Sequence, residues 1–344
     1  MENNFKSILG KAVEEEISRE EALTLFREAN ALDKILELFK VANNIRKIYM
    51  GDAVQLRAAI KMSSICMLSP KCKYCGWAAG TSTVPQIYQD GKEYFTRADE
   101  EIEKIAIALE SAGIRSMTCA GGCTDTEGQE AVRCAKAIKR VSDLDVIPVY
   151  GCDMSIDSLK ELKKIGISRV CCGLETTNEF LFSCLKPGDS LKKRLSICQW
   201  ICDLGLELST ILMIGVGEQY EDRVNDLFLL KQFKNLTELS ISSFMPRSGT
   251  PMANYPACTA FDHAKTIAIA RIVYKDVHIP TTAPYILPFE KEKDNLQLDL
   301  MAGADIIGGV TPHGLPSDVS QSIRQANLNE TVRMVNEIGL NIKV

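Results

Sequence analysis

The chain has 344 residues, of which 46% are hydrophobic and 25% are charged, and its formal net charge is -5 at pH 7. A chain of this size is long enough for one large domain or two modest ones, and apolar enough to fill a sizeable core. Its weakly acidic balance gives no electrostatic reason to expect nucleic acid or an anionic membrane as a partner, since both select basic patches.

The amino-terminal part of the chain is predicted to be helical. Residues 5–50 are rich in Glu, Lys, Ala and Leu at helical spacing, and Ser18 precedes Glu21 in a capping-box pattern. We interpret residues 1–52 as a helical extension that precedes the main domain. There is no amino-terminal apolar stretch of signal-peptide type and no apolar run near 18 residues, so we expect a cytoplasmic protein.

Strand-like apolar runs alternate with amphipathic helical stretches through the rest of the chain, and several of these helices end in a glycine, as at Gly113, Gly166 and Gly205. The pattern predicts a (β/α)8 TIM barrel over residues 53–315, closed by a C-terminal helical segment over residues 316–344. A doubly wound open sheet is the alternative, because alternation alone does not distinguish the two folds. The strand-like runs are 54–65, 114–120, 145–151, 168–174, 208–214, 238–244, 277–283 and 304–310.

Three cysteines, Cys66, Cys72 and Cys75, follow the first predicted strand within one loop. The active site of such a barrel lies at the carboxyl ends of its strands, which is where this loop falls. Three thiolates can hold three irons of a 4Fe-4S cluster and leave the fourth iron open to a substrate or cofactor. A structural zinc site is the alternative, but it typically needs four protein ligands in two pairs, and no second C-x2-C or H-x3-H pair follows Cys75.

The loop resembles the signature of the radical S-adenosylmethionine (SAM) superfamily, in which three cysteines bind a 4Fe-4S cluster and the open iron chelates the amino acid end of SAM. The usual spacing there is three residues and then two, whereas five residues separate Cys66 from Cys72 here. This CX5CX2C spacing resembles that of the HmdB-type maturases, which serve assembly of the iron-guanylylpyridinol cofactor of methanogen [Fe]-hydrogenase. The resemblance extends over most of the chain, but its specificity lies mainly in this loop.

The resemblance implies a set of SAM contacts at the strand ends. Tyr74 stands where the family places an aromatic ring against the adenine, and Gly121 and Gly122 stand where backbone oxygens bind the SAM ammonium. Glu175 and Arg194 match the biotin synthase-like branch, in which the acidic residue accepts from a ribose hydroxyl or the ammonium and the arginine pairs with the SAM carboxylate. The alternatives are a packing aromatic for Tyr74 and a solvated helix-start residue for Arg194.

Two further motifs continue the family's order along the chain. Ile214 and Gly215 lie in the run Thr210–Glu218, which resembles the G-x-I-x-G-x-x-E pattern that supports adenine, with Thr210 in place of the first glycine. The sixth predicted strand is followed by Gly249–Pro251, which is similar to the G-T-P turn of biotin synthase-like proteins.

The remaining cysteines do not match the second cluster of biotin synthase, which needs cysteines on the second, third and fifth strands, because only Cys119 falls at one of those positions. Cys171 and Cys172 are neighbours on a strand, so their side chains point to opposite sides and one of them can face the barrel interior. Cys198 and Cys202 share a helix face, where we interpret them as small hydrophobes.

Cys123 and Cys152 follow predicted strands over the expected cavity, which makes them candidates for substrate contact. Of the three histidines, His263, His278 and His313, only His313 follows a strand end and is predicted to look into the site; an ordinary loop histidine is the alternative. The sequence assigns no catalytic residue.

The resemblance implies an enzyme that reductively cleaves SAM at a 4Fe-4S cluster to a 5'-deoxyadenosyl radical, which abstracts hydrogen from a small molecule held in the barrel. It further implies a role in building the iron-guanylylpyridinol cofactor, with a ferredoxin or flavodoxin as electron donor. Two alternatives remain open. One is another biotin synthase-like lyase or mutase, such as the tyrosine lyases or methylornithine synthase, and the other is a non-catalytic iron-sulfur scaffold.

Overall fold

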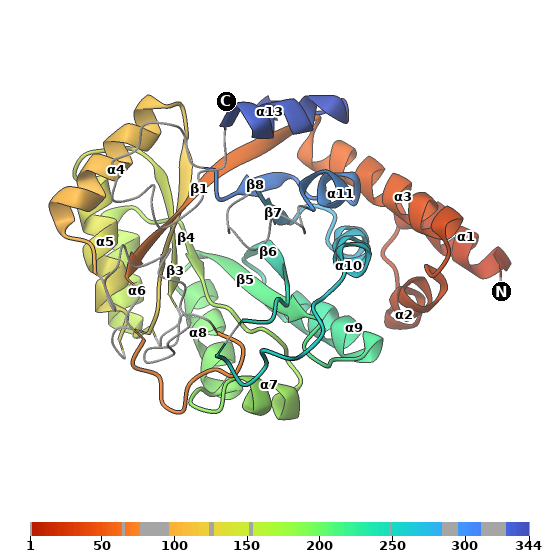
Figure 1. Ribbon diagram of the computed structural model, residues 1–344, viewed down its shortest axis with the longest axis horizontal. Coiled ribbons are helices and arrows are strands. Elements are labelled where there is room, and N and C mark those ends of the chain that lie inside the picture. Colours follow the sequence, from red (N-terminus) through yellow and green to blue (C-terminus); the bar gives the residue numbers. More distant parts are fainter. Residues whose placement is uncertain are drawn as a thin grey trace.

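The strands of the protein form a parallel ring, and the order of neighbours is β6, β5, β4, β3, β2, β1, β8, β7, with β9 paired to β1 outside this path (Figure 1). The computed structural model describes residues 2–63, 66–75, 96–123, 127–150, 154–247, 249–283, 295–310 and 328–343. The strands are β1 (Ala53–Ser63), β2 (Ser116–Gly121), β3 (Asp145–Tyr150), β4 (Arg169–Cys171), β5 (Glu207–Ile214), β6 (Leu236–Ser243), β7 (Pro280–Thr282), β8 (Ile306–Gly308) and β9 (Asn341–Lys343).

The ring closes between β6 and β7. His278, just before β7, forms a parallel bridge with Glu238 of β6. The amides of Leu239 and His278 donate to the carbonyl oxygens of His278 and Thr237 at 2.8 and 2.9 Å. Each of the eight predicted runs overlaps one of the strands β1 to β8, and the closure confirms the predicted (β/α)8 barrel over the open sheet.

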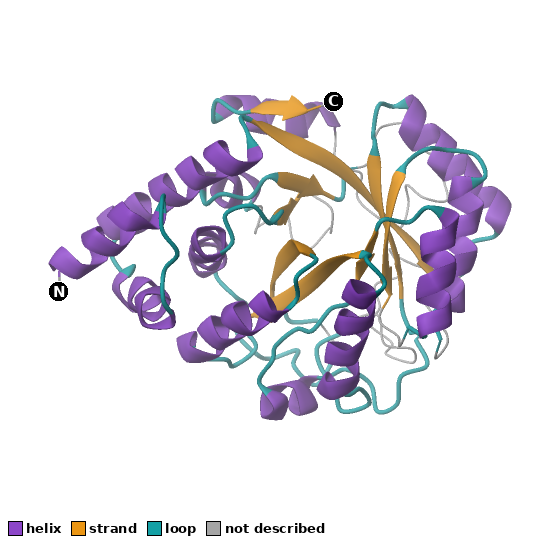
Figure 2. Cartoon of the chain, turned by 180° about the vertical axis from the view of Figure 1, so that it is seen from behind, coloured by secondary structure: helices purple, strands orange, loops and turns teal. Residues whose placement is uncertain are grey.

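Helices surround this ring, as the two opposite views show (Figures 1 and 2). Before β1 come three helices, and the capping box predicted at Ser18 and Glu21 is confirmed at the start of the second. Gly166 follows α6 with a φ of 95°, a left-handed conformation that a glycine adopts without a Cβ penalty. The helices are α1 (Glu2–Ala12), α2 (Arg19–Glu28), α3 (Leu32–Met50), α4 (Asp99–Ser111), α5 (Gln129–Lys139), α6 (Ile156–Ile165), α7 (Glu179–Leu185), α8 (Leu191–Asp203), α9 (Tyr220–Leu229), α10 (Ala260–Val273), α11 (Leu296–Met301) and α13 (Leu328–Glu337).

Helix α10 is buried on nearly all sides. It packs on β6 on one side and against α2 and α3 on the other, so every residue from His263 to Val273 is buried. This double cover explains why the α10 sequence is apolar almost all round, because a helix without a solvent face needs no polar stripe. The amino-terminal helices therefore extend the barrel's outer layer.

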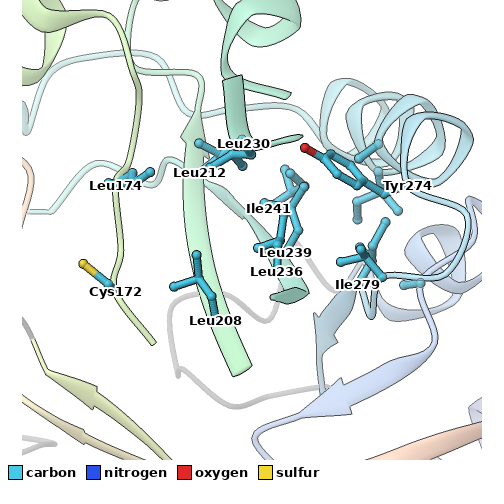
Figure 3. Close-up of a cluster of buried hydrophobic side chains, with 14 of the residues drawn as sticks. Cys172, Leu174, Leu208, Leu212, Leu230, Leu236, Leu239, Ile241, Tyr274 and Ile279 are labelled. Carbon is cyan, nitrogen blue, oxygen red and sulfur yellow. The ribbon is translucent and has the colours of Figure 1, made fainter. Parts of the chain in front are cut away.

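The barrel strands alternate between an outer and an inner face, as the period of a strand requires. On β5, Leu208 and Leu212 join the outer apolar core, which Figure 3 shows together with Leu239 of β6. Ser209 and Ile211, which alternate with them along the strand, line a cavity inside the barrel. The outer core holds the helices on the ring, and the inner face is left for function.

Buried charges fill the amino-terminal end of the barrel interior, which we call the barrel floor. Glu238 of β6 accepts from Arg57 of β1 at 2.8 Å, from Arg169 of β4 at 3.2 Å and from Ser209 of β5 at 3.0 Å. The carboxylate of Glu238 and the guanidinium of Arg57 are both 4% exposed, and Arg169 has a second partner in Glu207 at 2.6 Å. The charges are thus paired, which a buried ion needs.

Within the described ranges, no helix is both long and apolar enough to cross a membrane. After β8 the described chain resumes at α13 and ends in β9, a short strand that the sequence did not predict. The division into residues 1–52, 53–315 and 316–344 stays a prediction.

Candidate active site at the carboxyl end of the barrel

The cluster loop, residues 66–75, follows β1 and is held by two other parts of the chain. The amide of Met67 donates to the carbonyl oxygen of Cys123, which follows β2, at 2.6 Å. The amide of Lys73 donates to the carbonyl oxygen of Leu185 at the end of α7, at 2.9 Å. The three cysteines therefore lie over the carboxyl ends of the strands, where active sites of such barrels are found.

Gly188, in the turn between α7 and α8, supports the cluster loop. A Cβ at this position would lie 2.7 Å from the carbonyl carbon of Ser69 and 2.9 Å from the nitrogen of Pro70. Both separations are shorter than van der Waals contact, so the loop can pack this closely only against a residue without a side chain. The Pro-Gly pair at residues 187–188 marks a turn in the sequence, but it does not indicate what the turn packs against.

The three thiols of the cluster loop lie within electrostatic reach of one another and of two lysines. Burial raises the pKa of the Cys72 thiol to about 12, and the charge of Lys186 partly offsets this effect. Burial lowers the pKa of the Lys61 amine on β1 well below its ordinary value, and the charges of Cys75 and Cys66 partly offset this effect. Cys72 therefore holds its proton until a metal displaces it, and the Lys186 ammonium lies close enough to balance the thiolate that then forms.

The donor set fits a 4Fe-4S cluster, because its three thiolates can hold three of the four irons. Among the described residues, no three His, Cys, Asp or Glu side chains are grouped closely enough to hold one metal ion. A cubane places its irons apart, so its cysteine ligands do not have to meet at one point.

A row of buried charges leads away from the cluster loop. The Lys186 ammonium lies 3.8 Å from the Glu175 carboxylate and 3.1 Å from that of Asp189. Asp189 in turn accepts from Nε and Nη2 of Arg194 at 2.9 and 2.7 Å. The guanidinium of Arg194 is only 2% exposed, so it is not the solvated residue that was the alternative. Its pairing with a SAM carboxylate stays a prediction.

Glu175 has an unusual backbone. Its φ is 63°, in the left-handed region that non-glycine residues rarely adopt. Hydrogen bonds on both sides hold it there, because its amide donates to Ile211 at 2.9 Å and its carbonyl oxygen accepts from Met213 at 2.7 Å. The strand neighbour β5 thus fixes the direction in which the Glu175 carboxylate leaves the chain.

Tyr74 lies between an apolar cluster and Glu175. Its ring packs against a small group of buried side chains that includes Val216 and Phe244. Burial, followed by the charge of Glu175, raises the pKa of the Tyr74 hydroxyl well above its ordinary value, so it stays protonated and can donate to that carboxylate. Packing of the ring is therefore shown, and contact with adenine stays a prediction.

The loop after β5 is shaped by Glu218, the last residue of the adenine-type motif. Its carboxylate accepts from the amides of Gly215 and Val216, both at 2.8 Å, and pairs with Arg223 at 2.7 Å. Ile214, at the strand end, accepts at its carbonyl oxygen from the amide of Phe244 at 2.8 Å. These bonds give Ile214 and Gly215 a fixed backbone next to the site.

Gly121 has a packing reason for being glycine. A Cβ there would lie 2.6 Å from Cδ1 of the Tyr150 ring on β3, so the aromatic ring occupies the space of the missing side chain. Gly122 follows directly after the strand. The predicted role of both glycines in binding the SAM ammonium through backbone oxygens is not tested by this contact.

A cavity of about 310 Å³ occupies the barrel interior. Its lining comes from all eight strands of the ring, and α10 and α11 contribute where β6 and β7 separate. The lining includes Arg57, Ala59, Thr118, Ala120, Val149, Cys171, Ser209, Ile211, Glu238, Ser240, Ser242, His263, Thr281, Thr282, Asn295 and Asp299.

The cysteines outside the cluster loop take different places. Cys171 lines the cavity, whereas Cys172 packs beneath α8 and its thiol lies 3.6 Å from the carbonyl oxygen of Arg194, as the predicted opposite directions require. Cys119 points out of the barrel, where its sulfur lies 3.5 Å from the Tyr150 hydroxyl. This orientation removes the one cysteine that matched a biotin synthase-type second cluster. Cys123 is buried beside the cluster loop.

The prediction for the histidines was wrong in one respect. His263 lines the cavity although it lies on α10, and only His313 had been expected to face the site. The sequence places α10 outside the barrel, and it does not show that β6 and β7 separate and let a helix side chain reach the interior. His313 and Cys152 lie outside the described residues. Lys186, Asp189 and Gly188 were also missed, because only the folded chain brings their turn to the cluster loop.

The comparisons with known proteins agree with this site. The Radical SAM superfamily pattern matches residues 60–230. An uncharacterized protein of Methanocaldococcus jannaschii is 40% identical over 330 residues, which are 95% of this chain and 84% of that protein. The [FeFe] hydrogenase maturase subunit HydE of Thermotoga maritima is 28% identical over 348 residues, which are 92% of this chain and 86% of that protein. The crystal structure of methylornithine synthase (PylB) has the same fold, with a TM-score of 0.83 at 19% identity over 98% of this chain and 97% of that chain.

The chain belongs to the radical SAM superfamily, and it is similar to HydE and, at 26% identity over 284 residues, to a biotin synthase of Hydrogenobaculum sp.. It is an enzyme, and its cofactors are a 4Fe-4S cluster and SAM. Members of the family act on small molecules and use a reductant. The predicted enzyme class, fold and cofactors are thus confirmed.

Proposed function

We propose that this radical SAM enzyme acts in biosynthesis of the iron-guanylylpyridinol cofactor of [Fe]-hydrogenase, on a pyridinol precursor or on the source of the carbon ligands. The observation that carries the proposal is the CX5CX2C loop, whose five-then-two spacing resembles the HmdB-type maturases. A relative named as a hydrogenase maturase, HydE, covers 92% of the chain and supports a maturation role.

In this proposal the residues at the carboxyl end of the barrel have separate roles. Cys66, Cys72 and Cys75 hold the cluster. The Glu175 carboxylate, whose direction is fixed by the backbone hydrogen bonds to β5, accepts a hydrogen bond from SAM. The reduced cluster and SAM, when bound, supply the 5'-deoxyadenosyl radical that abstracts hydrogen from the substrate. The apolar group around Tyr74 and the closed barrel wall exclude water from that step.

A further set of contacts orients SAM. Gly121 and Gly122 offer backbone oxygens to the SAM ammonium. Arg194, which belongs to the charge row with Asp189 and Lys186, faces the SAM carboxylate. Ile214 and Gly215 support the adenine from the β5 loop, which Glu218 stabilises. Cys123, Cys152 and His313 are the proposed substrate contacts, and a ferredoxin or flavodoxin is the proposed electron donor.

The experiment that tests the function is anaerobic reconstitution with iron and sulfide, followed by reduction with dithionite and chromatography for 5'-deoxyadenosine after SAM is added. The wild type is expected to form 5'-deoxyadenosine, and Cys72→Ala is expected to form none. Cys202→Ala is the matched control, because Cys202 lies on α8 near the amino end of β5, away from the cluster loop, and its variant should cleave SAM like the wild type.

The specific role is tested by adding candidate pyridinols to the same assay. We expect a pyridinol to stimulate 5'-deoxyadenosine formation at least fivefold and to be changed in mass. Stimulation by an amino acid instead, such as tyrosine or lysine, would assign the enzyme to the lyases or mutases of the branch. A reconstituted 4Fe-4S cluster that cleaves no SAM under any of these conditions contradicts the radical mechanism.

A further inference from the structure

The barrel cavity has two chemically different sides. Above the floor residues Arg57 and Ser209, the side formed by β1, β2, β3 and β5 presents small or apolar residues, such as Ala59, Ala120 and Val149, and one hydroxyl, that of Thr118. The opposite side, formed by β6, β7 and the two helices that fill the gap between them, presents hydroxyl, amide and charged groups, such as Ser240, Thr282 and Asn295. A ligand that fits both sides must itself be polar along one side and carbon along the other.

The charged groups of the lining are paired with one another. Arg57 and Glu238 are 2.8 Å apart at the barrel floor. On the polar side, Nδ1 of His263 lies 3.1 Å from Oδ1 of Asp299, which makes an ion pair when the imidazole is protonated although the contact lacks hydrogen-bond geometry, and Nε2 of His263 faces the carbonyl oxygen of Ile241 at 2.8 Å. Among the described lining residues, no charge is therefore left to balance a charged ligand. A buried ion without a partner is costly, so the lining selects an uncharged molecule.

The hydroxyl groups of β6 are what the polar side offers to a ligand. Ser240 and Ser242 follow Glu238 at alternate positions, so they point to the same inner face of the strand. Neither hydroxyl makes a hydrogen bond to another described residue, whereas that of Ser209 donates to Glu238 at 3.0 Å and that of Thr281 to Asp299 at 2.6 Å. The hydroxyls of Ser240 and Ser242 therefore lie one after the other on the inner face of β6, above the barrel floor.

We propose that the cavity binds a small, uncharged ring that carries oxygen or N–H groups along one edge, as a hydroxypyridine does, and that Ser240 and Ser242 recognise that edge. The inference rests on the proposed function, which supplies the pyridinol ring. The cavity further requires that the bound molecule be uncharged, that its polar edge lie against β6, and that its carbon edge lie against β1 to β3.

The test uses equilibrium dialysis of the reconstituted enzyme at pH 7.5 with three probes. They are 2-pyridone, pyridine, which lacks the polar edge, and 6-hydroxynicotinate, which adds a carboxylate. We expect 2-pyridone to bind at least fivefold more tightly than either of the other two. Because no SAM cleavage enters the measurement, its outcome is independent of the 5'-deoxyadenosine assay that tests the proposed function.

The variants locate the binding. The double variant Ser240→Ala/Ser242→Ala is expected to weaken 2-pyridone binding at least fivefold, since two neutral hydrogen bonds are lost. Thr118→Val is the matched control, because the Thr118 hydroxyl lies on the opposite side and already donates to the carbonyl oxygen of Ala58 at 3.3 Å. Iron content and the thermal transition check that both variants fold.

Three results would overturn the inference. The first is absence of 2-pyridone binding. The second is equal or tighter binding of 6-hydroxynicotinate, which would mean that the cavity holds an unbalanced cation. The third is equal loss of binding in Thr118→Val and the double serine variant, which would place the ring elsewhere.

Discussion

Glu175 is the only non-glycine residue with a positive φ among the residues that the structure describes. Such a conformation costs on the order of 1 to 3 kcal/mol and persists where the surroundings hold it. Here two backbone hydrogen bonds to β5 do so. The strain places a carboxylate beside Lys186 and Tyr74, so we interpret it as a functional constraint.

We predict that Glu175→Gly separates function from stability. Glycine adopts a φ of 63° freely, so relief of the strain should offset the lost contacts with Lys186 and Tyr74 and leave the variant close to the wild type in stability, while its affinity for SAM should fall at least tenfold because the carboxylate is gone. Thermal denaturation and equilibrium dialysis with SAM measure the two quantities. A loss of more than about 2 kcal/mol of stability would instead assign the carboxylate a structural role.

Asp226 gives a prediction about pH. It is 4% exposed, and burial raises its pKa to about 6, although hydrogen bonds from Thr177 and Thr176 oppose the shift. A raised pKa means that the folded state favours the protonated carboxyl. This group therefore costs stability progressively as the pH rises from about 4 to 6, and the full cost, about 3 kcal/mol, is present above pH 6.

Replacement of Asp226 by Asn should remove that cost, because the amide oxygen can still accept from Thr177. We expect Asp226→Asn to match the wild type below pH 4 and to be more stable by about 2 to 3 kcal/mol at pH 8, as measured by urea denaturation at several pH values. The control Asp157→Asn, at a side chain that is 91% exposed, should show no such trend. A difference that does not grow with pH contradicts the assignment.

At the scale of elements, the turn between α7 and α8 supports the cluster loop through Gly188. The φ of Gly188 is not in the positive range, so an alanine there is opposed only by the contact of its Cβ with Ser69 and Pro70. We predict that Gly188→Ala displaces the loop and lowers the iron bound per chain after reconstitution by at least half. Iron analysis and the visible absorbance of the cluster measure this effect.

Gly10→Ala is the matched control for that prediction. Gly10 lies in α1, and a Cβ there would have no neighbour within 4 Å. Its variant should bind iron like the wild type. Full iron content in Gly188→Ala would show that the cluster loop can move away from the turn without losing its ligands.

The barrel strands were predictable because their apolar runs recur at the period of a β/α unit, and the glycines that end the helices mark their limits. The cluster loop was predictable because its cysteines are close in sequence. Lys186 and Asp189 were not, since their turn meets the loop more than a hundred residues away in the chain. The short strand β9 was not predicted, because a run of three residues is too short to show a strand pattern.

At the scale of the whole molecule, the barrel floor ties distant strands together. Glu238 on β6 neutralises Arg57 on β1 and contacts Arg169 on β4, so one carboxylate links three strands of the ring. The pairing matters because the groups are buried, and a buried charge that loses its partner is costly.

We therefore predict that Glu238→Gln lowers the free energy of unfolding by about 3 to 5 kcal/mol, since Arg57 is left without its counter-charge. Urea denaturation measures the change. Glu16→Gln is the control, because the carboxylate of Glu16 is 82% exposed and its ion pair with Lys231 is of the surface kind that contributes about 0.5 kcal/mol or less. Equal effects of the two substitutions would mean that the floor is hydrated.

The gap between β6 and β7 has a consequence for how this enzyme could change over evolutionary time. In the described chain these strands share the His278 bridge, whereas β5 and β6 stay paired up to Ile214 and Ser243. Beyond that bridge the wall consists of side chains from α10 and α11, such as His263 and Asp299. Substitutions on two helices can therefore reshape the chamber without altering strand register, so new substrates become accessible while the cluster loop and its supports stay unchanged.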